Sequence, residues 1–163
     1  MKKRKFLLTG LTVVLYSSFF VGCEEPKPEG MPKLHPVTLT FQQEGKPLAE
    51  ASIRLLPQFP CTWFSGGSTD ANGHAKLVTH GKYNGIPAGK YKICVDKFYS
   101  EGDLPSMDPN KPTKPMIHYN LVETKYTLPD KTPLEIEVKE GKNSFEPFDL
   151  GKVTKEQLKA PGT

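Results

Sequence analysis

Three cysteines are the residues whose type and position in this chain point most directly to chemistry. Cys23 directly follows an apolar run near the N-terminus, whereas Cys61 and Cys94 stand within the more polar remainder of the chain. A cysteine thiol can be acylated, oxidised to a disulfide or used as a metal ligand. Which of these applies depends on the compartment in which the chain works, and the N-terminus indicates that compartment.

The first 22 residues have the organisation of a secretory signal peptide. A basic segment precedes an apolar run that ends at Val21, and the small residue Gly22 stands just before Cys23. This is the order of regions found in export signals. The apolar run is shorter than the roughly 20 residues that a helix needs to cross a bilayer. We therefore interpret residues 1–22 as a cleaved signal peptide.

The residues Phe20-Val21-Gly22-Cys23 resemble the lipobox of bacterial lipoproteins, with Phe20 where that family usually has Leu. In the family, a diacylglycerol is attached to the cysteine through a thioether, cleavage falls directly before it, and the new amine is usually acylated. The resemblance implies that Cys23 is lipidated and that the chain is exported and anchored to a membrane, facing the periplasm or the cell surface. A plain signal peptide with an incidental cysteine is the alternative.

Removal of the signal peptide changes the charge balance. The whole chain has 22 basic and 18 acidic residues, a net charge of +4. Residues 1–22 contain four of the basic residues and none of the acidic ones, which leaves 18 of each. A mature chain without excess positive charge has no electrostatic footprint for nucleic acid, so we exclude nucleic acid as a partner. Segment 23–36, rich in proline and charge, is predicted to be a solvated tether.

Export also sets the expectation for Cys61 and Cys94. Two cysteines that remain after acylation of the first predict a disulfide in an oxidising compartment. It would close a loop of about 33 residues and stabilise the fold by roughly 3–4 kcal/mol. Two free thiols or a metal pair are the alternatives, and metal is the weaker one because no CxxC or closely spaced His accompanies either residue. Alternation around Tyr91 places Cys94 on the face away from the core, so the disulfide would lie outside the sheet.

The elements that position these residues are predicted from the alternation of apolar and polar residues. Strands are predicted at 37–41, 51–55, 75–79, 90–95, 132–139 and 144–150. No stretch after residue 22 has a helical period. We therefore predict an all-β, Ig-like Greek-key sandwich over residues 37–152. Segment 98–115 is predicted to be a long loop, either ligand-facing or a mere insertion, and 153–163 a flexible tail.

The segment from Thr69 to His74 has the composition of a tight hairpin turn. Asn72 and Gly73 adopt positive φ at low cost, as such turns require. Asp70 and Asn72 could also supply oxygen ligands to Ca²⁺. However, a calcium loop of about 12 residues needs further carboxylates, and residues 75–81 supply none. The hairpin is therefore preferred, and no metal site is predicted.

Three segments together resemble a known family. Gly45–Ala51, Thr69–Gly73 and Ile86–Tyr91 are similar to motifs of the carboxypeptidase regulatory-like, transthyretin-like domains of bacterial envelope lipoproteins. In that family the first motif joins two strands, the second is a hairpin and the third leads into a core strand. The similarity covers about residues 37–97 and, more loosely, 123–150. It implies a transthyretin-like sandwich and, because most members are non-catalytic modules, it implies no reaction.

The leading functional hypothesis is a lipid-anchored, non-catalytic envelope module that binds a protein or glycan partner or serves structurally. No catalytic residue and no cofactor is predicted. Aromatic side chains can stack on sugar rings or pack on a protein, although many are core or loop filler. The candidate binding surface consists of Trp63, Phe64, Phe98 and Tyr99, with Tyr83 as a further aromatic of the same kind.

Two other classes stay open. The transthyretin-like fold hosts a hydrolase of purine degradation with a C-terminal Tyr-Arg-Gly-Ser signature, which this chain lacks, and a related sandwich hosts non-haem iron dioxygenases that use two Tyr and two His. The residues available for such an iron site are His74, His80, His118, Tyr83 and Tyr119. The other class is a stalk or adhesin module with a Lys–Asn isopeptide bond.

Overall fold

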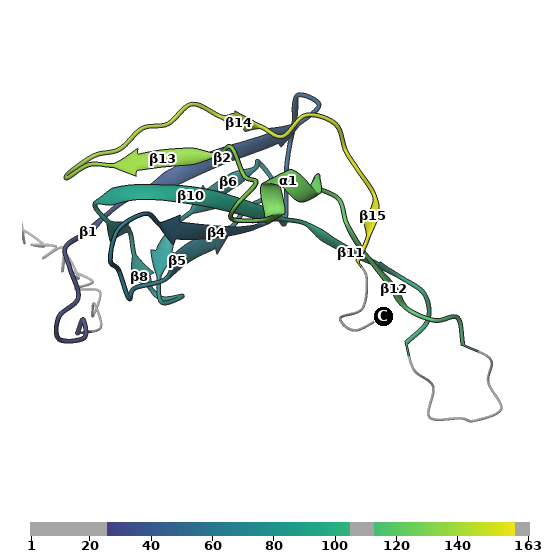
Figure 1. Cartoon of the computed structure of the whole chain (residues 1–163), viewed down its shortest axis with the longest axis horizontal. Helices are drawn as coiled ribbons and strands as arrows, with labels where there is room; N and C mark the ends of the chain where they lie inside the picture. The colour runs from purple at the N-terminus through teal and green to yellow at the C-terminus, as the bar shows by residue number, and fades with distance from the viewer. Residues whose placement is uncertain (1–25, 105–112, 159–163) are drawn as a thin grey trace, which may run out of the picture.

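The computed structural model describes residues 26–104 and 113–158 (Figure 1). Cys23 and the signal segment lie outside the described residues, as do the middle of the predicted 98–115 loop and the last five residues. Two layers of strands pack face to face, and the one helix of the described chain, α1 (Thr124–Thr127), is a single turn. The predicted all-β sandwich is confirmed.

The first layer is a six-stranded antiparallel sheet with the order β13-β10-β4-β5-β7-β8. Its longest strand, β10, pairs on both sides, so that Tyr91 lies opposite Pro57 on one neighbour and Ile136 on the other. The strands of this sheet are β4 (Ser52–Pro57), β5 (Ser65–Ser68), β7 (Val78–Thr79), β8 (Tyr83–Asn84), β10 (Gly89–Asp96) and β13 (Glu135–Val138).

The second layer is built around one strand that pairs on both edges. β2 is antiparallel to β3 and β6 and parallel to β14. Its residues Leu39 and Phe41 are completely buried, as the sequence pattern predicts. The strands of this layer are β2 (Thr38–Gln43), β3 (Lys46–Pro47), β6 (His74–Lys76) and β14 (Phe148–Asp149).

Apolar side chains of alternate positions from both layers form one core. In β10 the buried core side chains are Tyr91, Ile93 and Val95, as predicted. The parts of the core contributed by other segments include Val37, Leu39, Phe41, Ile53, Leu55, Leu77, Ile86, Ile136, Val138 and Leu150. Burial of this apolar surface is the main term that stabilises the fold.

The predicted hairpin turn after β5 is confirmed, because the Asp70 carboxylate accepts hydrogen bonds from the backbone N–H of Asn72 at 2.8 Å and of His74 at 2.9 Å. The predicted return strand 75–79, by contrast, is two strands. β6 pairs with β2 in the second layer, and β7 pairs with β5 in the first. Leu77 stands between them, fully buried, so the chain crosses from one layer to the other at this residue.

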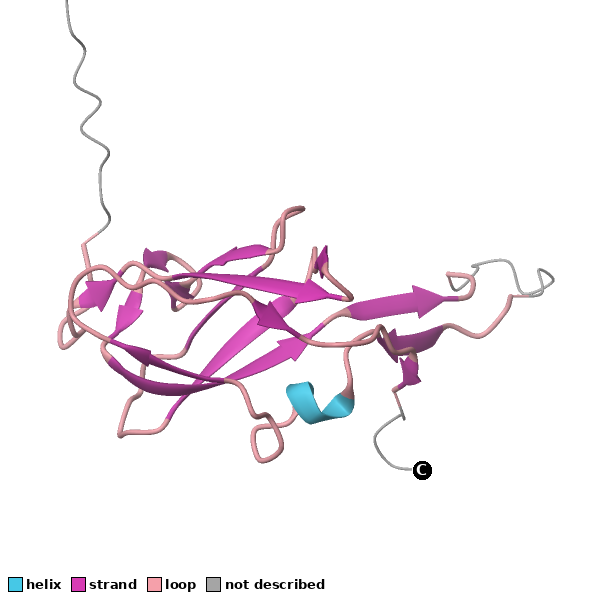
Figure 2. Ribbon diagram, turned by 90° about the horizontal axis from the view of Figure 1, so that it is seen from above, coloured by secondary structure: helices cyan, strands magenta, loops and turns pink. Residues whose placement is uncertain are grey.

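The predicted loop 98–115 and tail 153–163 contain structure that the pattern did not reveal. β11 (Phe98–Glu101) continues the line of β10 and pairs with β12 (Ile117–Asn120), and β12 pairs with β15 (Glu156–Gln157). These three strands form an arm that projects from one end of the sandwich (Figures 1 and 2). The predicted loop therefore begins with a strand, Phe98–Glu101, and part of the predicted tail completes the sheet of the arm.

The predicted tether also ends earlier than residue 36. β1 (Leu34–His35) pairs with β9 (Ile86–Pro87), and His35 is only 3% exposed. The folded part of the chain therefore begins at about Leu34. β1 lies at the end of the sandwich opposite the arm (Figure 1).

Candidate binding site

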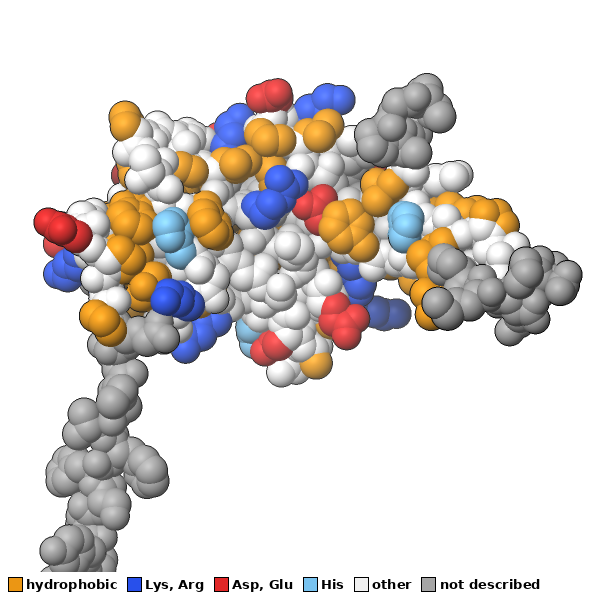
Figure 3. All heavy atoms as spheres, turned by 90° about the horizontal axis from the view of Figure 1, so that it is seen from below, with side chains coloured by type: hydrophobic (Ala, Val, Ile, Leu, Met, Phe, Trp, Pro, Cys, Tyr) orange, Lys and Arg blue, Asp and Glu red, His pale blue; other side chains and the backbone are white. Residues whose placement is uncertain are grey.

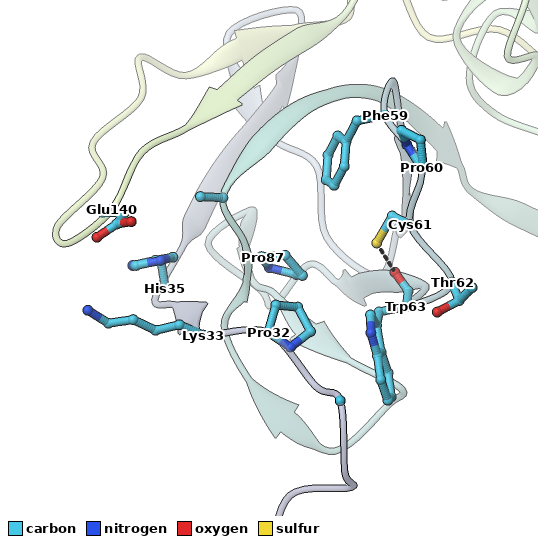
Figure 4. Close-up of a pocket in the computed structure, with 12 residues that line it drawn as sticks. Pro32, Lys33, His35, Phe59, Pro60, Cys61, Thr62, Trp63, Pro87 and Glu140 are labelled. Atoms are coloured by element: carbon cyan, nitrogen blue, oxygen red, sulfur yellow. Dashed lines mark hydrogen bonds between the residues drawn. The ribbon is translucent and has the colours of Figure 1, made fainter.

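A pocket of about 730 Å³ opens at the β1 end of the sandwich. Its volume lies within the range of small-ligand sites, roughly 300–1,000 Å³. Four segments meet there: the end of the tether, the loop after β4, the β9–β10 turn and the turn after β13 (Figure 4). The residues that line it are Gly30, Pro32, Lys33, His35, Phe59, Pro60, Cys61, Thr62, Trp63, Pro87, Ala88 and Glu140.

The loop after β4 is held by an aromatic contact with the core. Pro57 ends β4, and the ring of Phe59 then packs edge-on against Tyr91, with ring centroids 5.4 Å apart. Gly89 makes room for this ring, since a Cβ there would lie 2.2 Å from Phe59. The Tyr91 hydroxyl donates a hydrogen bond to the carbonyl of Pro87 at 2.9 Å. Burial raises the pKa of Tyr91, so this phenol stays neutral and works as a structural donor.

His35 fixes the opposite wall of the pocket. Its Nδ1 accepts a hydrogen bond from the backbone N–H of Gly141 at 2.9 Å, which ties the tether end to the turn after β13. That acceptor role places the ring proton of the neutral histidine on Nε2. Lys33, His35 and Glu140 stand on one side of the pocket and Trp63 on the other (Figure 4). The pocket therefore combines apolar walls of proline and aromatic rings with charged groups at its rim.

The predicted disulfide between Cys61 and Cys94 is wrong, because both residues are free thiols. The Cys61 thiol faces the pocket wall and donates to the carbonyl of Trp63 at 3.5 Å. The loop that carries Cys61 leaves the sheet where Gln58 bonds to Lys90. Cys94 lies four positions beyond Lys90 along β10, about 13 Å at the usual rise of a strand, so the loop with Cys61 leaves the sheet well away from Cys94. A disulfide requires Cα atoms within about 7 Å.

Cys94 does lie on the face of β10 opposite the core, as alternation predicts, but it is fully buried. The chain around α1 covers that face. Arg54 donates to the carbonyl of Thr127 at 3.1 Å, and Lys92 donates to the carbonyl of Pro129 at 3.3 Å. Burial raises the pKa of the Cys94 thiol, which keeps it protonated at neutral pH. No sequence pattern predicts this cover, since one helical turn has no detectable period.

The four aromatic residues of the predicted binding surface do not form one surface. Trp63 and Phe64 flank the ring of His80, with centroids 4.8 Å and 4.5 Å from it. Phe98 and Tyr99 lie on the arm, at the other end of β10. Figure 3 shows hydrophobic side chains near both ends of the molecule and also over the region between them. Only Trp63 of the four lines the large pocket, and Tyr83, the further aromatic, is buried.

The histidines named for an iron site are dispersed. His74 shares a hydrogen bond with the hydroxyl of Thr40 at 3.0 Å, and His118 shares one with the hydroxyl of Ser100 at 2.8 Å. His80 lies between its two aromatic neighbours. Within residues 26–104 and 113–158, no three His, Cys, Asp or Glu side chains are close enough to hold a metal ion together.

Sequence reasoning missed most of the pocket. Lys33 and His35 fall within the predicted tether, and Phe59 lies outside every predicted strand. The Pro-Gly corner at Pro87–Gly89 was the available signal, because a corner that needs glycine for close approach marks a place where two segments meet.

None of the helices in the described segments has the length and apolar character needed to span a membrane. Comparison with protein-family models, with curated proteins and with solved structures yields no match to this chain.

Proposed function

We propose that this chain is a lipid-anchored, non-catalytic envelope module of the transthyretin-like type that binds a glycan in the pocket beside Trp63. The observation that carries the binding role is the pocket itself. An open concavity with a tryptophan at one wall and charged groups at the other provides a stacking surface for a sugar ring and partners for its hydroxyls.

The location of the pocket fits an anchored module. Cys23 precedes Pro26, the first described residue, by three positions, so the chain between them spans at most about 11 Å. Gly30 and Pro32 already line the pocket. An acyl group on Cys23 would therefore hold the pocket end near the membrane, where envelope glycans are attached, and direct the arm away from it.

A non-catalytic role is supported by how the polar groups near the pocket are used. His35 is engaged in fixing the turn after β13, and the Cys61 thiol donates to a backbone carbonyl rather than lying beside a base. Nucleophilic catalysis requires a nucleophile within hydrogen-bond reach of its activating base. The side chains around this pocket are thus suited to recognition.

The test uses full-length protein extracted in detergent, first on an array of bacterial surface oligosaccharides and peptidoglycan fragments, then by calorimetric titration of the tightest ligand. Trp63 is the chain's single tryptophan, so its fluorescence reports occupancy directly. We expect Trp63→Ala to weaken binding by about tenfold or more, given the roughly 1–3 kcal/mol scale of stacking contacts. Phe98→Ala, which removes an exposed aromatic ring from the arm at the other end of the molecule, is the control. Absence of binding to every glycan, or an equal loss in the control, would overturn the proposal.

A further inference from the structure

The outer edge of β11 is an unpaired strand edge on the arm. All four residues of this strand are exposed, and β11 pairs only with β12 among the described residues. Hydrogen bonds alternate along an antiparallel pair. Leu121 donates its N–H to the carbonyl of Lys97, so the backbone of Lys97 is directed toward the chain of β12. By alternation, the backbone groups of Tyr99 and Glu101 also bond to β12. Phe98 and Ser100 therefore direct their N–H and C=O groups outward.

Natural sheets usually protect such edges with proline, lysine or a bulge. The β11 edge has none of these within Phe98–Glu101, and Phe98 and Tyr99 are 61% and 46% exposed. An exposed edge that carries apolar side chains and free backbone donors is a template for another strand.

From this edge we propose that the partner strand is β11 of a second copy of this chain. In an antiparallel pairing centred on Tyr99, Phe98 of each copy faces Ser100 of the other, so the outward groups of both residues form four interchain hydrogen bonds. The same register places Lys97 of each copy opposite Glu101 of the other. Opposite charges facing across a strand pair are favourable, and a two-fold axis makes both contacts occur twice.

The side chains on the two faces fit the same register. Tyr99 and Tyr119 are direct neighbours across β11 and β12, with ring centroids 6.4 Å apart, and the Lys155 ammonium lies 5.3 Å and 4.3 Å from the two centroids. Pairing through Tyr99 would extend this into a row of four tyrosines with a lysine at each end. Phe98 of each copy would stand diagonally across from the other on the opposite face, within reach of an aromatic contact.

The direct test is a disulfide cross-link in membranes that contain the full-length protein. Tyr99→Cys places two thiols at a non-hydrogen-bonded pair on the two-fold axis, where Cα atoms are about 4.5 Å apart and can be bridged. Ser100→Cys is the control, because its diagonal separation of about 7–8 Å is too long. Both are made in a Cys61→Ser background. We expect a covalent dimer for Tyr99→Cys alone. Absence of that dimer, or equal cross-linking of both variants, would overturn the proposal.

A second measurement isolates the backbone contacts. Ser100→Pro removes the outward N–H and the hydroxyl that bonds to His118 of β12, but no backbone bond to β12. Ser100→Ala removes the same hydroxyl and keeps the N–H. We expect light scattering over a concentration series to show that Ser100→Pro weakens self-association by about tenfold or more, since two interchain hydrogen bonds are lost, and that Ser100→Ala leaves it near wild type. A wild-type chain that stays monomeric in this series, or equal association of the two variants, would contradict the pairing.

Discussion

The Asp70 side chain shows how one carboxylate holds a turn. The hydrogen bond from the His74 backbone N–H is the largest cause that lowers the pKa of Asp70 below the ordinary 3.8; burial opposes it, and the bond from Asn72 lowers the pKa further. A lowered folded-state pKa means that the charged form stabilises the fold above the ordinary pKa. That stabilisation is lost as the pH falls through the folded-state pKa.

Asp70→Asn keeps an acceptor oxygen at this position but removes the charge. We expect wild type to have the higher urea midpoint at neutral pH and the two midpoints to converge in acid below the folded-state pKa of Asp70, because the carboxylate is then protonated. Urea unfolding followed by circular dichroism at both pH values measures this. A midpoint difference that is unchanged by acid would show that the charge is irrelevant and that only the acceptor geometry counts.

Cys61 and Cys94 differ in environment, and their reactivity should differ accordingly. Cys61 is half-buried beside an open pocket, whereas Cys94 is fully buried under the α1 segment, where burial raises its pKa. Because the thiolate is the reactive form, both factors protect Cys94. We expect iodoacetamide to alkylate Cys61 in the native protein and Cys94 only after unfolding, as read by peptide mass spectrometry. If both resist alkylation until a reductant is added, the two residues form a disulfide after all.

The β5–β6 hairpin depends on a glycine for space as well as for backbone conformation. Gly73 has φ +77°, and a Cβ there would lie 2.3 Å from the carbonyl oxygen of Phe41, on the neighbouring β2. Gly45, in the β2–β3 turn, has a similar φ of +71° but open space around it. Replacing each of these two glycines with alanine therefore separates the strain of a positive φ from the steric clash of the added methyl group.

We expect Gly45→Ala to lower the free energy of unfolding by about 1–2 kcal/mol, the usual strain of an L-residue at positive φ. Gly73→Ala should cost clearly more, because the hydrogen bond from Phe41 N–H to the Gly73 carbonyl, 2.9 Å long, must also shift. Guanidinium unfolding of both variants gives the comparison. Equal costs would show that the turn moves away from β2 without resistance.

At the scale of elements, the sequence predicts what local chemistry determines. The inward positions of β2, β10 and β13 and the turn at Asp70 follow from alternation and turn composition. The arm does not, because segment 98–115 contains prolines and charges and its strands bury almost no side chains, so they leave no alternating pattern. The pocket was missed for a related reason: its walls come from four segments that meet only through long-range pairing, such as Leu34 opposite Pro87.

At the scale of the molecule, one continuous line of chain, β10 followed by β11, joins two parts of very different packing. Tyr91 and Ile93 in β10 are fully buried and lie between two neighbouring strands, whereas Phe98–Glu101 are exposed and have one neighbour among the described strands. Local opening needs less free energy where few apolar contacts must be broken. The sandwich around β10 is thus the part that opens least readily, and the arm is the part able to adapt to a partner.

Amide hydrogen exchange along β10 and β11 measures both the local stability of each strand and the pairing of the β11 edge. At low concentration we expect the β10 amides to exchange only through global unfolding and the β11 amides to exchange faster, with Tyr99 slower than Phe98 and Ser100 because it bonds to β12. At high concentration, pairing of two β11 edges should slow Phe98 and Ser100 selectively. The Ser100→Ala variant should keep this selective slowing, and Ser100→Pro should lose it at Phe98. A uniform slowing of all four β11 amides would instead mean that concentration stabilises the whole arm, without the alternating bonds that define a strand pair.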